Sequence, residues 1–179
     1  KVVDQDLANP NLRSIVVGMH AALPESISRD HSMNEWLDKK WQRGIETGTR
    51  VYRKLLSARK SKNVYVLASH SHYFMQDIFN TQYWRSNGGV LQGWIVGTAG
   101  AQRYPLPEHP TAKEARTDVY GYLLGTVDSS GGVSFTFKET AEDSIPGYVK
   151  KRYPPGFVHW CFEHNRKGDD TLPLCPACR

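Results

Sequence analysis

Short apolar runs separated by polar loops fill the first part of the chain. Residues 13–19 (RSIVVGM) and 64–68 (VYVLA) are rich in consecutive apolar residues, which predicts strands that are buried on both faces. Between them, apolar side chains recur at helical spacing from about residue 35 to residue 58. Because Asn34 stands before this stretch as a candidate N-cap, we expect one long helix between two buried strands.

The later predicted elements are mostly strands. Residues 93–98 (GWIVGT) predict a third strand, whereas the aromatic, glycine-containing stretch 73–93 predicts a covering loop. Residues 119–128 and 133–139 predict two strands joined as a hairpin by a serine- and glycine-rich turn. The order of strand, helix, strand, loop, strand and hairpin indicates an α+β (mixed α/β) fold.

The composition changes after residue 143, where the chain becomes rich in proline and basic residues. We therefore expect a folded domain over residues 1–143 and a tail over residues 144–179. A hydrophobic content of 39% over 179 residues is enough for one core. No apolar run reaches the roughly 18 residues that a membrane span needs. Residues 1–10 also lack the apolar stretch of a signal peptide.

The formal net charge of +5 is spread along the chain, with basic clusters at residues 59–62 and 150–152. Such clusters are usually solvated surface, although a basic balance also suits an anionic substrate. The charge alone does not choose between a phosphate ester and a nucleic acid as that partner.

Histidines follow two of the predicted strands. His20 comes directly after the first strand, and His70 and His72 come directly after the second. Ligands gather at the carboxyl ends of strands in open α/β sheets, and imidazole is a common ligand for Zn, Fe, Ni and Cu. A histidine at a strand end is also often only a hydrogen-bonded loop residue. By itself the spacing therefore indicates a candidate metal site.

Three segments carry a family resemblance. Residues 16–26 (VVGMHAALPES), 63–79 (NVYVLASHSHYFMQDIF) and 93–107 (GWIVGTAGAQRYPLP) resemble the later blocks of bacterial calcineurin-like metallophosphoesterases, and the likeness extends over residues 14–137. The resemblance implies part of a four-layer α/β/β/α sandwich with a two-metal site that hydrolyses phosphate esters. It implies Mn, Fe or Zn as the metals. His20 and His70 match ligands of one ion, and His72 matches a ligand of the other.

The chain departs from the family pattern in two respects. Ser69 stands where the family usually has glycine before the His-x-His pair. The earlier blocks, Asp-x-His, Gly-Asp-x-x-Asp and Gly-Asn-His-Asp/Glu, are missing. The resemblance is therefore to the C-terminal half of the domain. We expect the bridging carboxylate, and hence catalysis, to need sequence outside this chain, such as a second chain that carries the N-terminal half.

Two further residues are candidates for the catalytic site. His31 lies in the loop after His20 and is a candidate proton donor, although a pair with Asp30 that stabilises the loop explains it as well. Arg103 follows the third strand and is a candidate phosphate contact, although a surface arginine is an equal alternative.

Cysteine occurs only in the last nineteen residues. Cys161-x-x-His164 and Cys175-Pro-Ala-Cys178 have the residue types and pair spacings of a structural zinc site. A disulfide from Cys161 to one of the other two cysteines, or an exposed redox pair, would use the same residues.

Two classes of function fit these observations. The first is a metal-dependent phosphoesterase. The second is a non-catalytic binding fragment whose zinc-knuckle-like tail and basic surface contact nucleic acid or a protein partner. The metal content of the purified protein separates the two.

Overall fold

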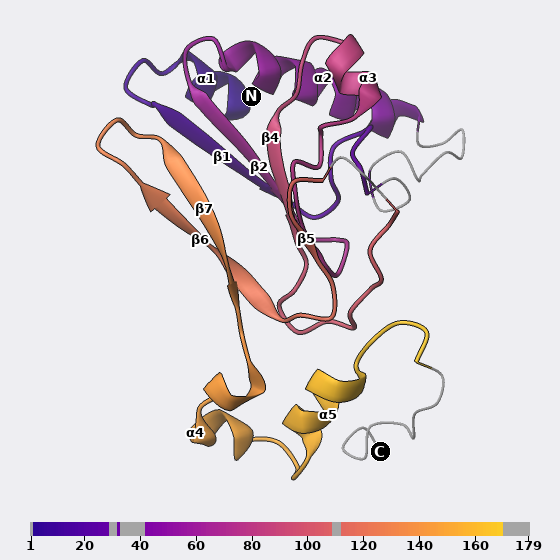
Figure 1. Ribbon diagram of the computed structural model, residues 1–179. Helices are drawn as coiled ribbons and strands as arrows, with labels where there is room; N and C mark the ends of the chain where they lie inside the picture. The colour runs from indigo at the N-terminus through magenta and orange to yellow at the C-terminus, as the bar shows by residue number, and fades with distance from the viewer. Residues whose placement is uncertain (1, 29–31, 33–41, 109–111, 170–179) are drawn as a thin grey trace.

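The computed structural model describes residues 2–28, 32, 42–108 and 112–169. Within these ranges the chain forms a five-stranded mixed sheet, a separate two-stranded hairpin and several helices (Figure 1). The α+β class expected from the sequence is therefore confirmed. No helix in these ranges has both the length and the apolar character that crossing a bilayer requires.

The five-stranded sheet has the order β1-β2-β4-β3-β5. Its parallel part consists of β1 (Ser14–Met19), β2 (Asn63–Ala68) and β4 (Gln92–Val96). The short strands β3 (Phe74–Gln76) and β5 (Ala115–Arg116) complete it in antiparallel orientation. Because β1, β2 and β4 run in the same direction, their carboxyl ends lie at the same edge of the sheet.

Helices cover one face of this sheet (Figure 1). They are α1 (Val2–Ala8), α2 (Gln42–Ala58) and α3 (Gln82–Ser86). The ring of Tyr52 in α2 stacks on the ring of Trp84 in α3 with centroids 3.5 Å apart, and both side chains are fully buried. The main core lies between these helices and the sheet.

The hairpin of β6 (Gly121–Val127) and β7 (Val133–Glu139) covers the opposite face. Tyr65 of β2 and Trp94 of β4 point to this side and pack against Phe135 of β7. Alternate residues of β2 therefore enter the helical core and the hairpin core. This double burial explains why β2 is apolar at consecutive positions.

The segment 73–93, which we expected to be a loop, contains two short elements. Phe74–Gln76 forms β3, and Gln82–Ser86 forms α3. The Thr81 hydroxyl caps α3 by accepting a hydrogen bond from the backbone N–H of Trp84 at 3.3 Å. Elements of three and five residues are too short to show a period in the sequence. The predicted helix at 35–58 corresponds to α2, and residues 33–41 lie outside the described ranges.

The segment after residue 143, which we expected to be a tail, begins with folded structure. A 3-10 turn η3 (Glu142–Ser144) is followed by α4 (Gly147–Lys150) and α5 (Phe157–His164). The imidazole Nδ1 of His159 in α5 lies 3.0 Å from a carboxylate oxygen of Glu142. Glu142, through this hydrogen bond and its charge, raises the pKa of His159 above the usual range for histidine.

The side chain of Arg103 fastens α5 to the rest of the fold. It is only 4% exposed, and its guanidinium donates hydrogen bonds to the backbone carbonyls of Phe162 (2.6 Å), Asn165 (3.3 Å) and Asp118 (3.2 Å). It also lies 5.0 Å from the centre of the Tyr120 ring. Cations favour the carboxyl end of a helix, where carbonyls lack intrahelical partners. Arg103, a candidate phosphate contact by sequence, therefore acts as the C-terminal cap of α5.

Replacing Arg103 by glutamine should release α5. The change leaves partly buried carbonyls without their charged donor, so we expect it to lower the free energy of unfolding by about 1–2 kcal/mol. Urea unfolding measures this loss, and limited proteolysis should show faster cleavage after residue 145. The control Arg50→Gln changes an exposed arginine on α2 and should have little effect on either readout. Equal behaviour of the two variants would contradict the capping role.

Candidate metal centre

The pairing of β1 with β2 brings His20 and His70 together. Met19 pairs with Ala68 at the end of the parallel ladder, so the next residues of both strands leave the sheet side by side. The backbone N–H groups of Ser69 and His70 both donate to the carbonyl of His20, at 2.9 and 2.8 Å. Backbone hydrogen bonds alone therefore fix the positions of His20 and His70 relative to each other.

The two imidazole rings also meet. His70 Nδ1 lies 2.8 Å from His20 Nε2, and the ring planes are nearly perpendicular, with centroids 4.7 Å apart. A neutral imidazole has one N–H and one lone pair, so one ring can donate to the other. Two nitrogens bound at right angles to one ion, each about 2.1 Å from it, are separated by about 3.0 Å. The pair therefore fits either a direct hydrogen bond or two neighbouring positions around one metal ion.

His72 contacts the loop that follows β4. Its Nδ1 lies 2.8 Å from the carbonyl of Gln102, and its ring packs against that of Tyr104 with centroids 4.3 Å apart. Because a carbonyl only accepts, this contact places the proton on Nδ1 and leaves the lone pair on Nε2. A metal-binding histidine commonly makes this same kind of bond through its second nitrogen.

The described residues contain no group of three or more His, Cys, Asp or Glu side chains that could hold one metal ion. Of the three histidines we expected to converge, the structure brings together His20 and His70 and directs His72 toward the loop after β4. Residues 70–73 form a bend and not a strand. The rule that residues two apart share a side applies to extended strands only.

Gly97, directly after β4, supports the bend that carries His70 and His72. A Cβ atom at this position would meet the backbone carbonyl oxygens of Ser71 and Ser69 closer than van der Waals contact allows. The Gly97 N–H donates to the carbonyl of Tyr73 at 3.2 Å. The end of β4 therefore packs backbone against backbone on the bend, and only glycine leaves enough room.

The remaining predicted site residues fall into two groups. His31, Cys175 and Cys178 lie outside the described residues. Cys161 and His164 are three residues apart on α5, and residues at this spacing share one face of a helix. The structure thus describes one half of the predicted zinc set.

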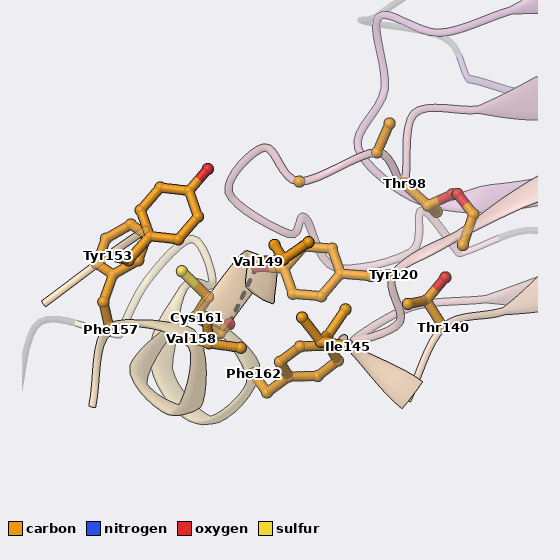
Figure 2. A pocket seen from close by; sticks show the side chains of 13 residues that line it. Thr98, Tyr120, Thr140, Ile145, Val149, Tyr153, Phe157, Val158, Cys161 and Phe162 are labelled. Carbon is orange, nitrogen blue, oxygen red and sulfur yellow. Dashed lines mark hydrogen bonds between the residues drawn. The ribbon is translucent and has the colours of Figure 1, made fainter. Parts of the chain in front are cut away.

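Next to Cys161 lies an apolar cavity of about 400 Å³ that the sequence did not indicate (Figure 2). It opens between the loop after β4, the start of β6 and the helices α4 and α5, and its apolar walls include Ile145, Val149, Tyr153, Phe157, Val158 and Phe162. The hydroxyl of Tyr120 donates to the carbonyl of Cys161 at 3.0 Å. Burial raises the pKa of this hydroxyl, so it stays protonated and keeps donating. The sequence did not indicate this cavity because we predicted the segment that forms its helical wall to be a proline-rich, basic tail.

Gly97→Ala should disturb the histidine-bearing bend. The added methyl group would push against two backbone carbonyls, so we expect a loss of about 1–3 kcal/mol in the free energy of unfolding. The NMR signals of the His70 and His72 rings should shift. The matched control is Gly18→Ala in β1, where an added Cβ meets nothing within 4 Å. Unchanged histidine signals in a folded Gly97→Ala protein would show that the bend does not depend on this contact.

Comparison of the chain with protein-family models, curated proteins and solved structures gives no match. The comparisons therefore assign no family.

Proposed function

We propose that this protein is a metal-dependent phosphoesterase in which His20 and His70 bind one metal ion and His72 binds the second. The observation that carries this proposal is the pairing of two histidines from adjacent parallel strands, with ring nitrogens 2.8 Å apart. Two separate chain segments must fold correctly to produce this arrangement. It lies at the carboxyl edge of the sheet, where α/β folds commonly bind ligands.

The proposed roles follow from the ring contacts. His20 and His70 offer two nitrogens at a separation suited to neighbouring ligands of one ion. His72 keeps its Nε2 lone pair, because Nδ1 is held by the carbonyl of Gln102. Bound Mn, Fe or Zn ions would supply an activated water and stabilise negative charge on a phosphate ester. His31 remains the proposed proton donor.

The described part of the fold agrees with a half-domain. It contains a helix layer, a mixed sheet and a hairpin packed on the other face of that sheet. In the proposed α/β/β/α sandwich this hairpin belongs to the second sheet. The carboxylate that bridges two ions would come from sequence outside this chain, including a second chain with the N-terminal half. The proposed substrate is a phosphate ester, and the C-terminal set Cys161, His164, Cys175 and Cys178 would bind a separate structural zinc.

A non-catalytic binding fragment is the second candidate. It is favoured by one observation, that the described residues contain no group of three or more metal-binding side chains. In that case the rings form only a hydrogen bond, and the basic surface and zinc-knuckle-like tail contact nucleic acid or a protein partner. The two candidates differ in whether the histidines bind metal.

Calorimetric titration with Mn²⁺ separates the two candidates, because Mn²⁺ has little preference for the cysteines of the tail. We expect binding that His70→Ala weakens at least about tenfold. The matched control is His159→Ala, which removes an exposed histidine from α5 and should leave Mn²⁺ affinity unchanged. Hydrolysis of a chromogenic phosphate ester by this chain alone should be slow, because the bridging carboxylate is missing.

Two results would contradict the proposed function. If His70→Ala and His159→Ala bind Mn²⁺ as the unmodified protein does, the histidine pair is not a metal site. If the chain alone turns over the ester rapidly and His70→Ala abolishes this, the site is already complete and the need for outside sequence is wrong.

A further inference from the structure

A basic cavity lies at the end of β1 and β2 opposite to the histidines. Its volume is about 330 Å³, and its walls come from the residue before β1, the turn between α2 and β2, and the tip of the β6–β7 hairpin. Four of the lining residues are cations, namely Arg13, Arg59, Lys60 and Lys62. The other lining residues are neutral and polar, namely Ser61, Asn63 and Ser130. No lining residue is acidic.

Two of the cations are held by backbone carbonyls and not by carboxylates. The guanidinium of Arg13 donates to the carbonyl of Ser130 at 3.3 Å, and that of Arg59 donates to the carbonyl of Val90. A guanidinium has five N–H donors, so these contacts position each group and leave other donors for a ligand. The positive charges are not neutralised, because neither arginine forms an ion pair with a carboxylate in the described part of the chain.

Lys62 adds a buried charge. The residue is 9% exposed, and its ammonium donates to the carbonyls of Asn9 and Leu12 at 2.5 and 2.8 Å. Burial of a cation is costly unless an anion compensates it, and carbonyl dipoles compensate it only in part. The hairpin carboxylate of Asp128 is not among the lining residues. It accepts hydrogen bonds from Ser130 and Gly132 within its own turn.

From this arrangement we infer that the cavity binds a phosphate group carried by a small molecule, such as a phosphomonoester or a diphosphate. A multiply charged oxyanion needs positive charge and hydrogen-bond donors around it. The cavity offers cations that carbonyls hold in place, together with serine and asparagine side chains, and its walls carry no acidic residue. The cavity is open to solvent, and its volume of about 330 Å³ is of a size for a small phosphate-bearing molecule, whereas a nucleic acid strand covers several nucleotides. Binding of a strand would favour a long basic groove with aromatic side chains for base stacking, and no aromatic residue lines this cavity.

The proposed phosphate site is separate from the candidate metal centre. Arg13 precedes β1 and His20 follows it, so the two sites lie about 23 Å apart at the usual rise of a strand. The inference therefore does not depend on the proposed phosphoesterase function. Either one can fail without the other.

Calorimetric titration of the whole chain with pyrophosphate, without added metal and at about 50 mM salt, tests the inference. Lys60→Gln removes one exposed cation from the cavity wall and should weaken binding about tenfold. The matched control is Lys151→Gln, which makes the same change in net charge at an exposed position next to α4. It should leave the affinity unchanged. Arg59→Gln should weaken binding to a similar extent, with thermal unfolding as the check that the variant is folded.

Three outcomes would overturn the inference. In the first, pyrophosphate does not bind. In the second, Lys60→Gln and Lys151→Gln weaken pyrophosphate binding equally, which would show attraction to net charge only. In the third outcome, a single-stranded oligonucleotide binds through Lys60 while pyrophosphate does not, which would show an extended polyanion surface. Loss of pyrophosphate binding in Lys60→Gln and in folded Arg59→Gln, with the control unaffected, supports the site.

Discussion

The rest of the candidate site depends on the parallel pairing of β1 with β2. This register ends with Met19 opposite Ala68. The His20 carbonyl then accepts hydrogen bonds from the backbone N–H groups of Ser69 and His70, which follow β2. A slip of one residue would turn the apolar side chains of β1 from the core toward the exposed side. The same constraint that buries the core therefore also sets the distance between the two imidazoles.

Packing against both faces of the sheet positions the rest of the structure around the His20–His70 pair. Helices pack on one face and the β6–β7 hairpin on the other, so β2 and β4 are held from both sides, whereas Val16 of β1 stays exposed. At the carboxyl ends, Gly97 lets β4 approach the bend that carries His70. At the amino ends, the hairpin tip and the α2–β2 turn gather the cations of the basic cavity. One sheet thus presents imidazoles at one edge and uncompensated positive charge at the other.

The sequence predicted the parts whose signal is local. Consecutive apolar residues in 64–68 located β2, and the serine- and glycine-rich turn between residues 128 and 133 located the hairpin. It did not reveal that His72 contacts the loop after β4, because residues 70–73 leave the sheet in a bend that packs against Gly97, which is distant in sequence. Nor did it reveal the buried role of Arg103, because the carbonyls that the guanidinium caps belong to α5, about sixty residues later. Features that depend on contacts between distant segments could not be found from periodicity.

The central claim is that His20 and His70 bind one ion together. Anomalous diffraction from crystals soaked in Mn²⁺ tests it most directly, because the method locates the ion relative to each ring nitrogen. The account predicts one peak about 2.0–2.3 Å from both His20 Nε2 and His70 Nδ1. An intact hydrogen bond between the two rings, with the manganese bound elsewhere or absent, would contradict it.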